Sequence, residues 1–146
     1  MEIVEQGNSA TLVLLDEVTL TNSFNDNVSE AFRISPLLQL ELGFVYTPGS
    51  GETSNKATIK VLHSADGANF EEYSIASDGT PSGGVVESTL YRRRFVIIGD
   101  GTAAEDRWYP LPTGAKHVKL AAMESGVASN PGTLTIKARI TNVTNL

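Results

Sequence analysis

Polar and apolar residues alternate strictly along several segments of this chain. Residues 56–61 and 133–140 change character at every step, and residues 38–46 place leucines and aromatic residues at alternate positions. A period of two puts one side of an extended segment in a core and the other side in water, which is typical of half-buried strands. No comparable run has a helical period, so the pattern predicts an all-β protein.

Turn-forming residues divide the alternating segments at regular intervals. Asp66-Gly67 lies between two predicted strands and is a strong hairpin signal. Gly-, Ser- and Pro-rich stretches at 48–55 and 76–84 predict flexible loops, and residues 85–98 predict one long strand. About eight or nine strands with long loops favour an antiparallel, jelly-roll-like β-sandwich.

The sequence predicts one folded domain preceded by a short arm. Residues 1–10 include several polar and small residues and are expected to form a loose N-terminal arm, whereas residues 11–146 are expected to form a single β-sandwich domain. The first strand is predicted at 11–15, with a continuation at 18–22 after a break at Asp16-Glu17. The expected core consists of Leu40, Leu42, Phe44, Ile59, Val61, Val118, Leu120, Leu134, Ile136 and Ile140.

Composition narrows the possible functions. The 146 residues include no cysteine, so disulfides, thiolate metal sites and cysteine nucleophiles are excluded, and a reducing compartment is favoured. A formal net charge of −6 opposes binding to nucleic acid or to anionic membranes. No apolar stretch approaches the ~20 residues of a spanning helix, and no signal-peptide pattern opens the chain. We therefore expect a soluble protein that is made in the cytoplasm.

Residues that commonly carry chemistry are present, but they do not form a recognisable motif. His63 and His117 lack metal-ligand spacing, no nucleophile elbow surrounds any serine, and the adjacent Glu71 and Glu72 face opposite sides of a strand. The sequence therefore predicts no catalytic residue, no metal and no cofactor, with a sugar or ester hydrolase as the rival hypothesis. A calcium site is a further alternative to a plain acidic turn, and its ligands would be Asp100, Glu105 and Asp106.

Two short motifs are candidates for contact with a partner. Arg92, Arg93 and Arg94 are consecutive, with Arg92 and Arg94 on one side of the predicted strand. They indicate either an edge strand whose arginines pair with the protein's own acids, or a contact surface for an acidic partner. Trp108 and Tyr109 indicate either an exposed aromatic platform or a cap on the core.

Three features occur together in the second half of the chain: the hairpin Asp66-Gly67-Ala68-Asn69-Phe70, the strand 116–123, and the turn Asn130-Pro131-Gly132-Thr133 before the last strand. The combination resembles small β-sandwich virion proteins of tailed bacteriophages, in particular capsid decoration or cement proteins. The resemblance covers residues 35–143, and it transfers no site residues.

This resemblance implies a non-enzymatic structural role on the virion. Such proteins bind the major capsid protein and one another, often as trimers, and they reinforce the capsid surface. Two alternatives remain open: a carbohydrate-binding sandwich, which uses a similar hairpin, and a tail or receptor-binding accessory protein.

Overall fold

The computed structural model describes residues 2–6, 9–33, 38–72, 80–82, 85–87, 94–98, 108–111 and 117–142, and it describes side chains for 10–33, 40–72, 94–97 and 117–141. Every regular element in these ranges is a strand, and each pairing is antiparallel. The all-β prediction is therefore confirmed.

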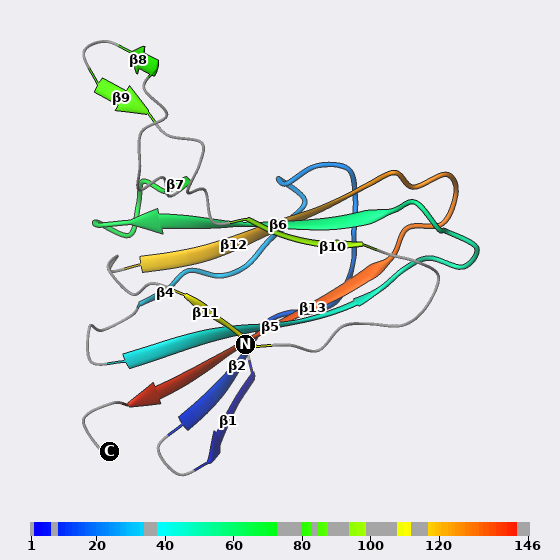
Figure 1. Ribbon diagram of the computed structural model, residues 1–146. Helices are drawn as coiled ribbons and strands as arrows, with labels where there is room; N and C mark the ends of the chain where they lie inside the picture. Colours follow the sequence, from blue (N-terminus) through cyan, green and yellow to red (C-terminus); the bar gives the residue numbers. More distant parts are fainter. Residues whose placement is uncertain are drawn as a thin grey trace.

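Two sheets face each other across a common core (Figure 1). Sheet A contains, in spatial order, β1 (Glu2–Gln6), β2 (Ser9–Thr19), β13 (Thr133–Asn142), β5 (Leu38–Thr47) and β11 (Trp108–Leu111). Sheet B contains β10 (Arg94–Ile98), β6 (Lys56–Ser64), β12 (His117–Ser125) and β3 (Asn27–Val28), with β4 (Phe32–Arg33) also on β12 and β7 (Glu71–Glu72) also on β6. A separate two-stranded ribbon is formed by β8 (Thr80–Ser82) and β9 (Val85–Glu87).

The strand order is that of a jelly roll. The short strands β3 and β4 together occupy one position beside β12. If that position is counted as one strand, and β1 and the outlying β7–β9 are set aside, eight strands remain. Sheet A then contains the first, eighth, third and sixth strands, and sheet B the second, seventh, fourth and fifth. This arrangement confirms the predicted jelly-roll-like sandwich.

The core lies where the period-two pattern places it. Nine of the ten expected residues are buried, with at most 1% of their surface exposed. Ile140, near the end of β13, is only partly buried and packs against the edge of the core. Between the sheets, the ring of Phe44 lies 4.9 Å from that of Phe95.

The predicted break at Asp16-Glu17 is a β-bulge inside one continuous strand, β2. Asp16 and Glu17 together oppose only Thr135 of β13, and Glu17 has a positive φ of 44°. The Glu17 amide donates to Oγ1 of Thr135 at 3.0 Å, which stabilises this conformation. A second irregularity follows at Leu14, because Leu15 pairs with Ile136 whereas Val13 pairs with Lys137. Bulges change which residues face the core, so Leu12 and Leu15 are both buried.

Three other sequence predictions are corrected by the structure. Residues 2–6 are not a loose arm, because β1 pairs with β2 and extends sheet A. The segment 76–84 contains the strand β8. Residues 85–98 do not form one strand of one sheet, because β9 pairs with β8 whereas β10 pairs with β6.

Candidate interaction surface

The sequence-predicted contact residues lie on different sheets. Arg94 begins β10 in sheet B, while Trp108 and Tyr109 begin β11 at the edge of sheet A. Arg92 and Arg93 lie outside the described residues. Arg94 and the aromatic pair therefore belong to edge strands of different sheets.

Trp108 and Tyr109 pair with two consecutive residues of β5, Gly43 and Leu42. Leu42 faces the core and Gly43 occupies the alternate, outward position. The backbone thus gives the two aromatic residues positions on opposite faces of sheet A.

Arg94 is paired with an acid of this chain. Its Nε and Nη2 atoms donate to the two carboxylate oxygens of Glu72 at 2.6 and 2.9 Å, in a bidentate ion pair. The hydrogen bonds to Glu72 raise the pKa of Arg94. Of the two sequence-based interpretations, pairing with the protein's own acids therefore holds for this arginine.

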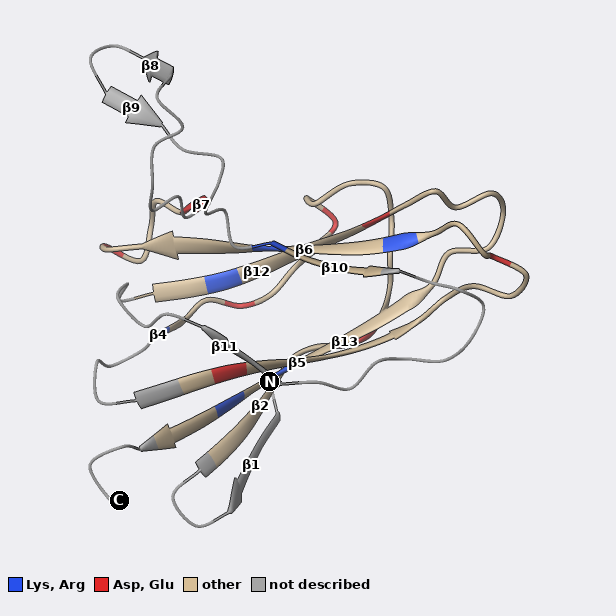
Figure 2. Ribbon diagram, viewed as in Figure 1, with Lys and Arg blue, Asp and Glu red and all other residues tan. Residues whose placement is uncertain are grey.

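Arg94 belongs to a larger surface on the outer side of sheet B, which we call the basic face. It consists of the outward positions of β6, β10 and β12. These positions carry four cations: Lys56, Lys60, Arg94 and Lys119. Glu72 of β7 lies on the same side of sheet B, because it pairs with the outward Leu62. Figure 2 shows basic segments on β6 and β12 of this sheet.

Two of these cations are direct cross-strand neighbours. Arg94 pairs with Lys60, which in turn pairs with Ala121 of β12. Like charges directly opposite each other destabilise a sheet. The bidentate contact with Glu72 offsets this repulsion on the Arg94 side.

Aromatic rings lie against three of the four cations of the basic face. The Nζ atom of Lys60 lies 4.5 Å from the ring centroid of Phe24, and Cζ of Arg94 lies 5.5 Å from the same centroid. On the next row, Nζ of Lys119 lies 4.3 Å from the ring centroid of Phe70. Cation–π contacts of this kind hold each charged group against an aromatic ring, and Lys60 and Lys119 are each partly buried.

Exposed apolar side chains lie on the same face. Among the described residues, two large hydrophobic side chains are exposed, Val96 at 56% and Val28 at 39%. Val96 occupies an outward position of β10, and Val28 pairs with Ala121 beside Lys60. Exposed apolar side chains beside an arginine are features of protein-binding surfaces, in which arginine is enriched.

The hairpin that follows β6 is held by Asp66. Its carboxylate accepts hydrogen bonds from the amides of Ala68 and Asn69, each at 2.9 Å, and from the hydroxyl of Ser64 at 2.8 Å. These bonds hold the pKa of Asp66 far below its usual range. The Asp-Gly sequence signal therefore marks a tight turn, as predicted, and the turn is stabilised by hydrogen bonds among its own residues.

Both histidines lie near this hairpin. A Cβ atom added at Gly67 would lie 3.3 Å from the ring of His117, so the turn packs closely against that side chain. His63 is half-buried on β6, and burial lowers its pKa. In the part of the chain that the structure describes, no three His, Asp or Glu side chains are grouped so that they could hold a metal ion. The candidate calcium ligands Asp100, Glu105 and Asp106 lie outside that part.

At the opposite end of the sandwich, Glu52 anchors the β12–β13 loop. Its side chain is only 4% exposed, and it accepts from the amides of Ala128, Ser129 and Asn130 at 3.0, 2.7 and 2.7 Å. These three hydrogen bonds lower the pKa of Glu52. The β5–β6 loop, predicted to be flexible, is therefore fastened to a segment more than 70 residues away.

Glu124 forms a second anchor beneath the first. It is 2% exposed, accepts the hydroxyl proton of Tyr46 and the amide of Gly132 at 2.8 Å, and also accepts from Nδ2 of Asn55 at 3.2 Å. Burial and the hydrogen bond to Glu124 raise the pKa of Tyr46. Sequence reasoning missed both glutamates. The available signal was Glu124 at an inward position of an alternating strand, where a charge needs partners.

The described part of the chain contains no helix that is long and apolar enough to span a membrane. The sequence matches no protein-family model and no curated protein.

The chain is similar to solved structures at low sequence identity. The chain is similar to the SPBc2 prophage-derived protein YomS, with 11% identity, a TM-score of 0.50, and coverage of 96% of this chain and 98% of that one. Two Porphyromonas gingivalis proteins overlap less well. The K1 cleaved adhesin domain of Lys-gingipain gives a TM-score of 0.35 at 16% identity, covering 78% of this chain and 60% of that one. Dimeric latent PorU gives 0.27 at 13% identity, covering 96% and 10%. The first similarity shows a fold common to nearly the whole length of both chains.

Proposed function

We propose that this chain is a non-enzymatic structural protein of a bacteriophage virion, of the capsid decoration or cement type. In this role it binds the major capsid protein and further copies of itself on the capsid surface. The observation that carries the proposal is the basic face, where Arg94 and Lys60 are cross-strand neighbours and two valines are exposed. A sheet that tolerates this arrangement gains stability when an acidic, partly apolar partner covers it.

Two further observations support a structural role. The jelly roll is shared over nearly its full length with a prophage-derived protein. The loops at one end of the sandwich are fastened by buried carboxylates rather than left free to close over a substrate. A scaffold of this kind suits a protein that must hold its shape on a lattice.

The experiment that tests this proposal is co-sedimentation with capsid shells. The shells are assembled from the major capsid protein of the phage whose genome encodes this chain. We expect saturable binding of the purified protein, and a rise in the temperature at which the shells rupture. The proposal fails if the protein stays in the supernatant at every salt concentration, or if it binds without changing shell stability.

The rival function, carbohydrate binding, depends on Trp108 in the edge strand β11. A glycan array with the wild-type protein and Trp108→Ala separates the two functions. Saturable glycan binding that the substitution abolishes favours the rival, while its absence together with shell binding supports the capsid role.

A further inference from the structure

Charge is distributed unevenly over this protein. The formal net charge is −6, while the basic face with its four cations and Glu72 carries +3, which leaves −9 for the rest of the chain. The basic face therefore differs in sign from most of the surface that another copy would present to it.

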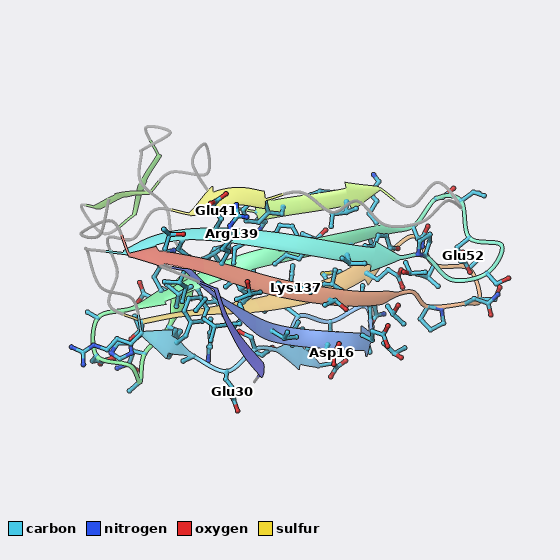
Figure 3. The ribbon with its side chains drawn as sticks, turned by 90° about the horizontal axis from the view of Figure 1, so that it is seen from below. Asp16, Glu30, Glu41, Glu52, Lys137 and Arg139 are labelled. Carbon is cyan, nitrogen blue, oxygen red and sulfur yellow. The ribbon has the colours of Figure 1, made fainter. Side chains whose placement is uncertain are left out.

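An acidic surface lies along the side of the sandwich formed by β2 and the β3–β4 connection. We call it the acidic flank, and it consists of Asp16, Glu17 and Glu30, all exposed. The bulge in β2 concentrates two of these acids opposite a single residue of β13. Figure 3 shows Asp16 and Glu30 along the same long side, away from Glu41. One exposed cation, Arg33 of β4, lies near this flank.

The neighbouring edge strand adds to the negative charge of this side. β1 pairs with β2 and contributes Glu2 and Glu5 to the sequence of the edge. By contrast, the strand order places β10, with Arg94, at the edge of sheet B opposite to β3. Arg94 therefore lies at the edge of sheet B that is farthest from the acidic flank, whereas Lys119 lies on β12, the strand next to β3.

We propose that the basic face of one copy binds the acidic flank of a second copy, head to tail. Face-to-face pairing would bring two Arg94–Lys60 rows together, and like charges in a contact cost affinity. A head-to-tail contact pairs each cationic row with acids, while Val96 and Val28 supply the apolar part of the interface. Such a heterologous contact repeats around a ring, or along a filament if the rotation does not close. This inference rests on the proposed structural role and names the surface that self-assembly uses.

Charge-reversal variants test the contact directly. The face variant carries Lys60→Glu and Lys119→Glu, and the flank variant carries Asp16→Lys and Glu17→Lys. Because Glu17 has a positive φ, Glu30→Lys provides a flank change that leaves the bulge intact. Lys137→Glu, on the outward side of β13 in sheet A, is the matched control that changes net charge without touching the face. Circular dichroism and urea unfolding confirm that each variant is folded.

Sedimentation velocity then reads out assembly. We expect the wild type and Lys137→Glu to assemble with increasing concentration and to dissociate as salt rises. We expect the face and flank variants each to need at least about tenfold more protein to assemble, in line with the effect of charges placed against like charges. An equal mixture of the two should assemble as the wild type does, because the intact face meets the intact flank and the reversed face meets the reversed flank. A chain that carries all four substitutions should assemble again.

Three results would overturn the inference: a wild type that is monomeric at all concentrations, single variants that assemble as the wild type does, or a mixture that does not co-assemble. These outcomes are separable from those of the capsid experiment. A monomer that binds shells overturns the head-to-tail contact and leaves the capsid role standing. Salt-sensitive assembly without shell binding does the reverse.

Discussion

Removing one hydroxyl group from the buried end of the sandwich should destabilise the whole domain. Tyr46 is 1% exposed, and its hydroxyl donates to Glu124 and accepts from Nδ2 of Asn55 at 2.5 Å. Tyr46→Phe keeps the ring and leaves no large cavity, so the change isolates the hydrogen bonds. The carboxylate of Glu124, itself 2% exposed, then loses one donor in a site that water does not readily enter.

Hydrogen bonds to charged groups contribute about 1.5–3 kcal/mol each, and an unsatisfied buried group costs a similar amount. We therefore expect Tyr46→Phe to lower the free energy of unfolding by about 2 kcal/mol, a substantial part of the roughly 5–15 kcal/mol typical of a domain. With a urea m-value of about 2 kcal/mol per molar, the unfolding midpoint should fall by about 1 M.

The assay is urea unfolding of the wild type, Tyr46→Phe, Glu124→Gln and the double variant. Because the two side chains contact each other, the double variant should lose clearly less than the sum of the two single losses. A midpoint shift below about 0.3 M for Tyr46→Phe, or losses that simply add, would refute the assignment of stability to this network.

The remaining predictions concern pH, backbone space and surface charge. The pKa of Tyr46 is raised on folding, so the stability that its protonated hydroxyl contributes is complete below the unfolded pKa near 10 and falls above it. The wild type should therefore lose stability relative to Tyr46→Phe as the pH rises past 10. Parallel curves of stability against pH for the two proteins would contradict this. The pKa values of Glu52 and Asp66 are lowered on folding, so the stability that these carboxylates contribute is lost as the pH falls below about 4. In urea titrations, the double variant Glu52→Gln/Asp66→Asn should therefore lose less of its free energy of unfolding below this pH than the wild type does. An equal loss in both proteins would count against these anchors. Gly132→Ala should destabilise strongly, because its Cβ would lie 2.6 Å from the Thr47 carbonyl oxygen and 2.7 Å from Glu124, whereas Gly51→Ala meets only the strain of a positive φ; equal melting temperatures would contradict the packing. Val96→Ser should leave the urea midpoint nearly unchanged, because the side chain is 56% exposed, and a large loss would mean that the valine is buried in solution.

The core could be predicted from the sequence because period-two alternation is a local signal. Residues such as Leu40, Ile59 and Val118 face inward on long strands whose pattern is uninterrupted. The prediction weakened where the pattern changes register. The bulges in β2 bring Leu12 and Leu15 to the same side despite their odd spacing, which strict alternation does not anticipate.

The sequence predicts an arm at this position because β1 is short and its two apolar residues, Ile3 and Val4, are adjacent rather than alternating with polar ones. β1 is an edge strand, and edge strands tolerate charge on both sides. The dipeptide Gly7-Asn8, between the segments that form β1 and β2, is a two-residue hairpin signal that would have revealed the pairing.

The anchors at the loop end and the basic face depend on contacts between residues far apart in sequence. Glu52 accepts hydrogen bonds from amides 76–78 positions away, and Arg94 on β10 pairs with Glu72 on β7, both strands being paired with β6. Neither contact is visible in a local sequence motif. The arginine run contributes Arg94 to this surface, and Arg92 and Arg93 lie outside the described residues. It could not show that Lys60 and Val96 complete the surface, because that requires the strand order of sheet B.

A cryo-electron-microscopy map of the virion proposed to carry this chain tests the central claim most directly. We predict density for this jelly roll on the capsid exterior, with the basic face of each copy covered by the acidic flank of its neighbour. Particles that lack the protein, or that carry it with Lys60, Arg94 and Val96 open to solvent, would contradict the account.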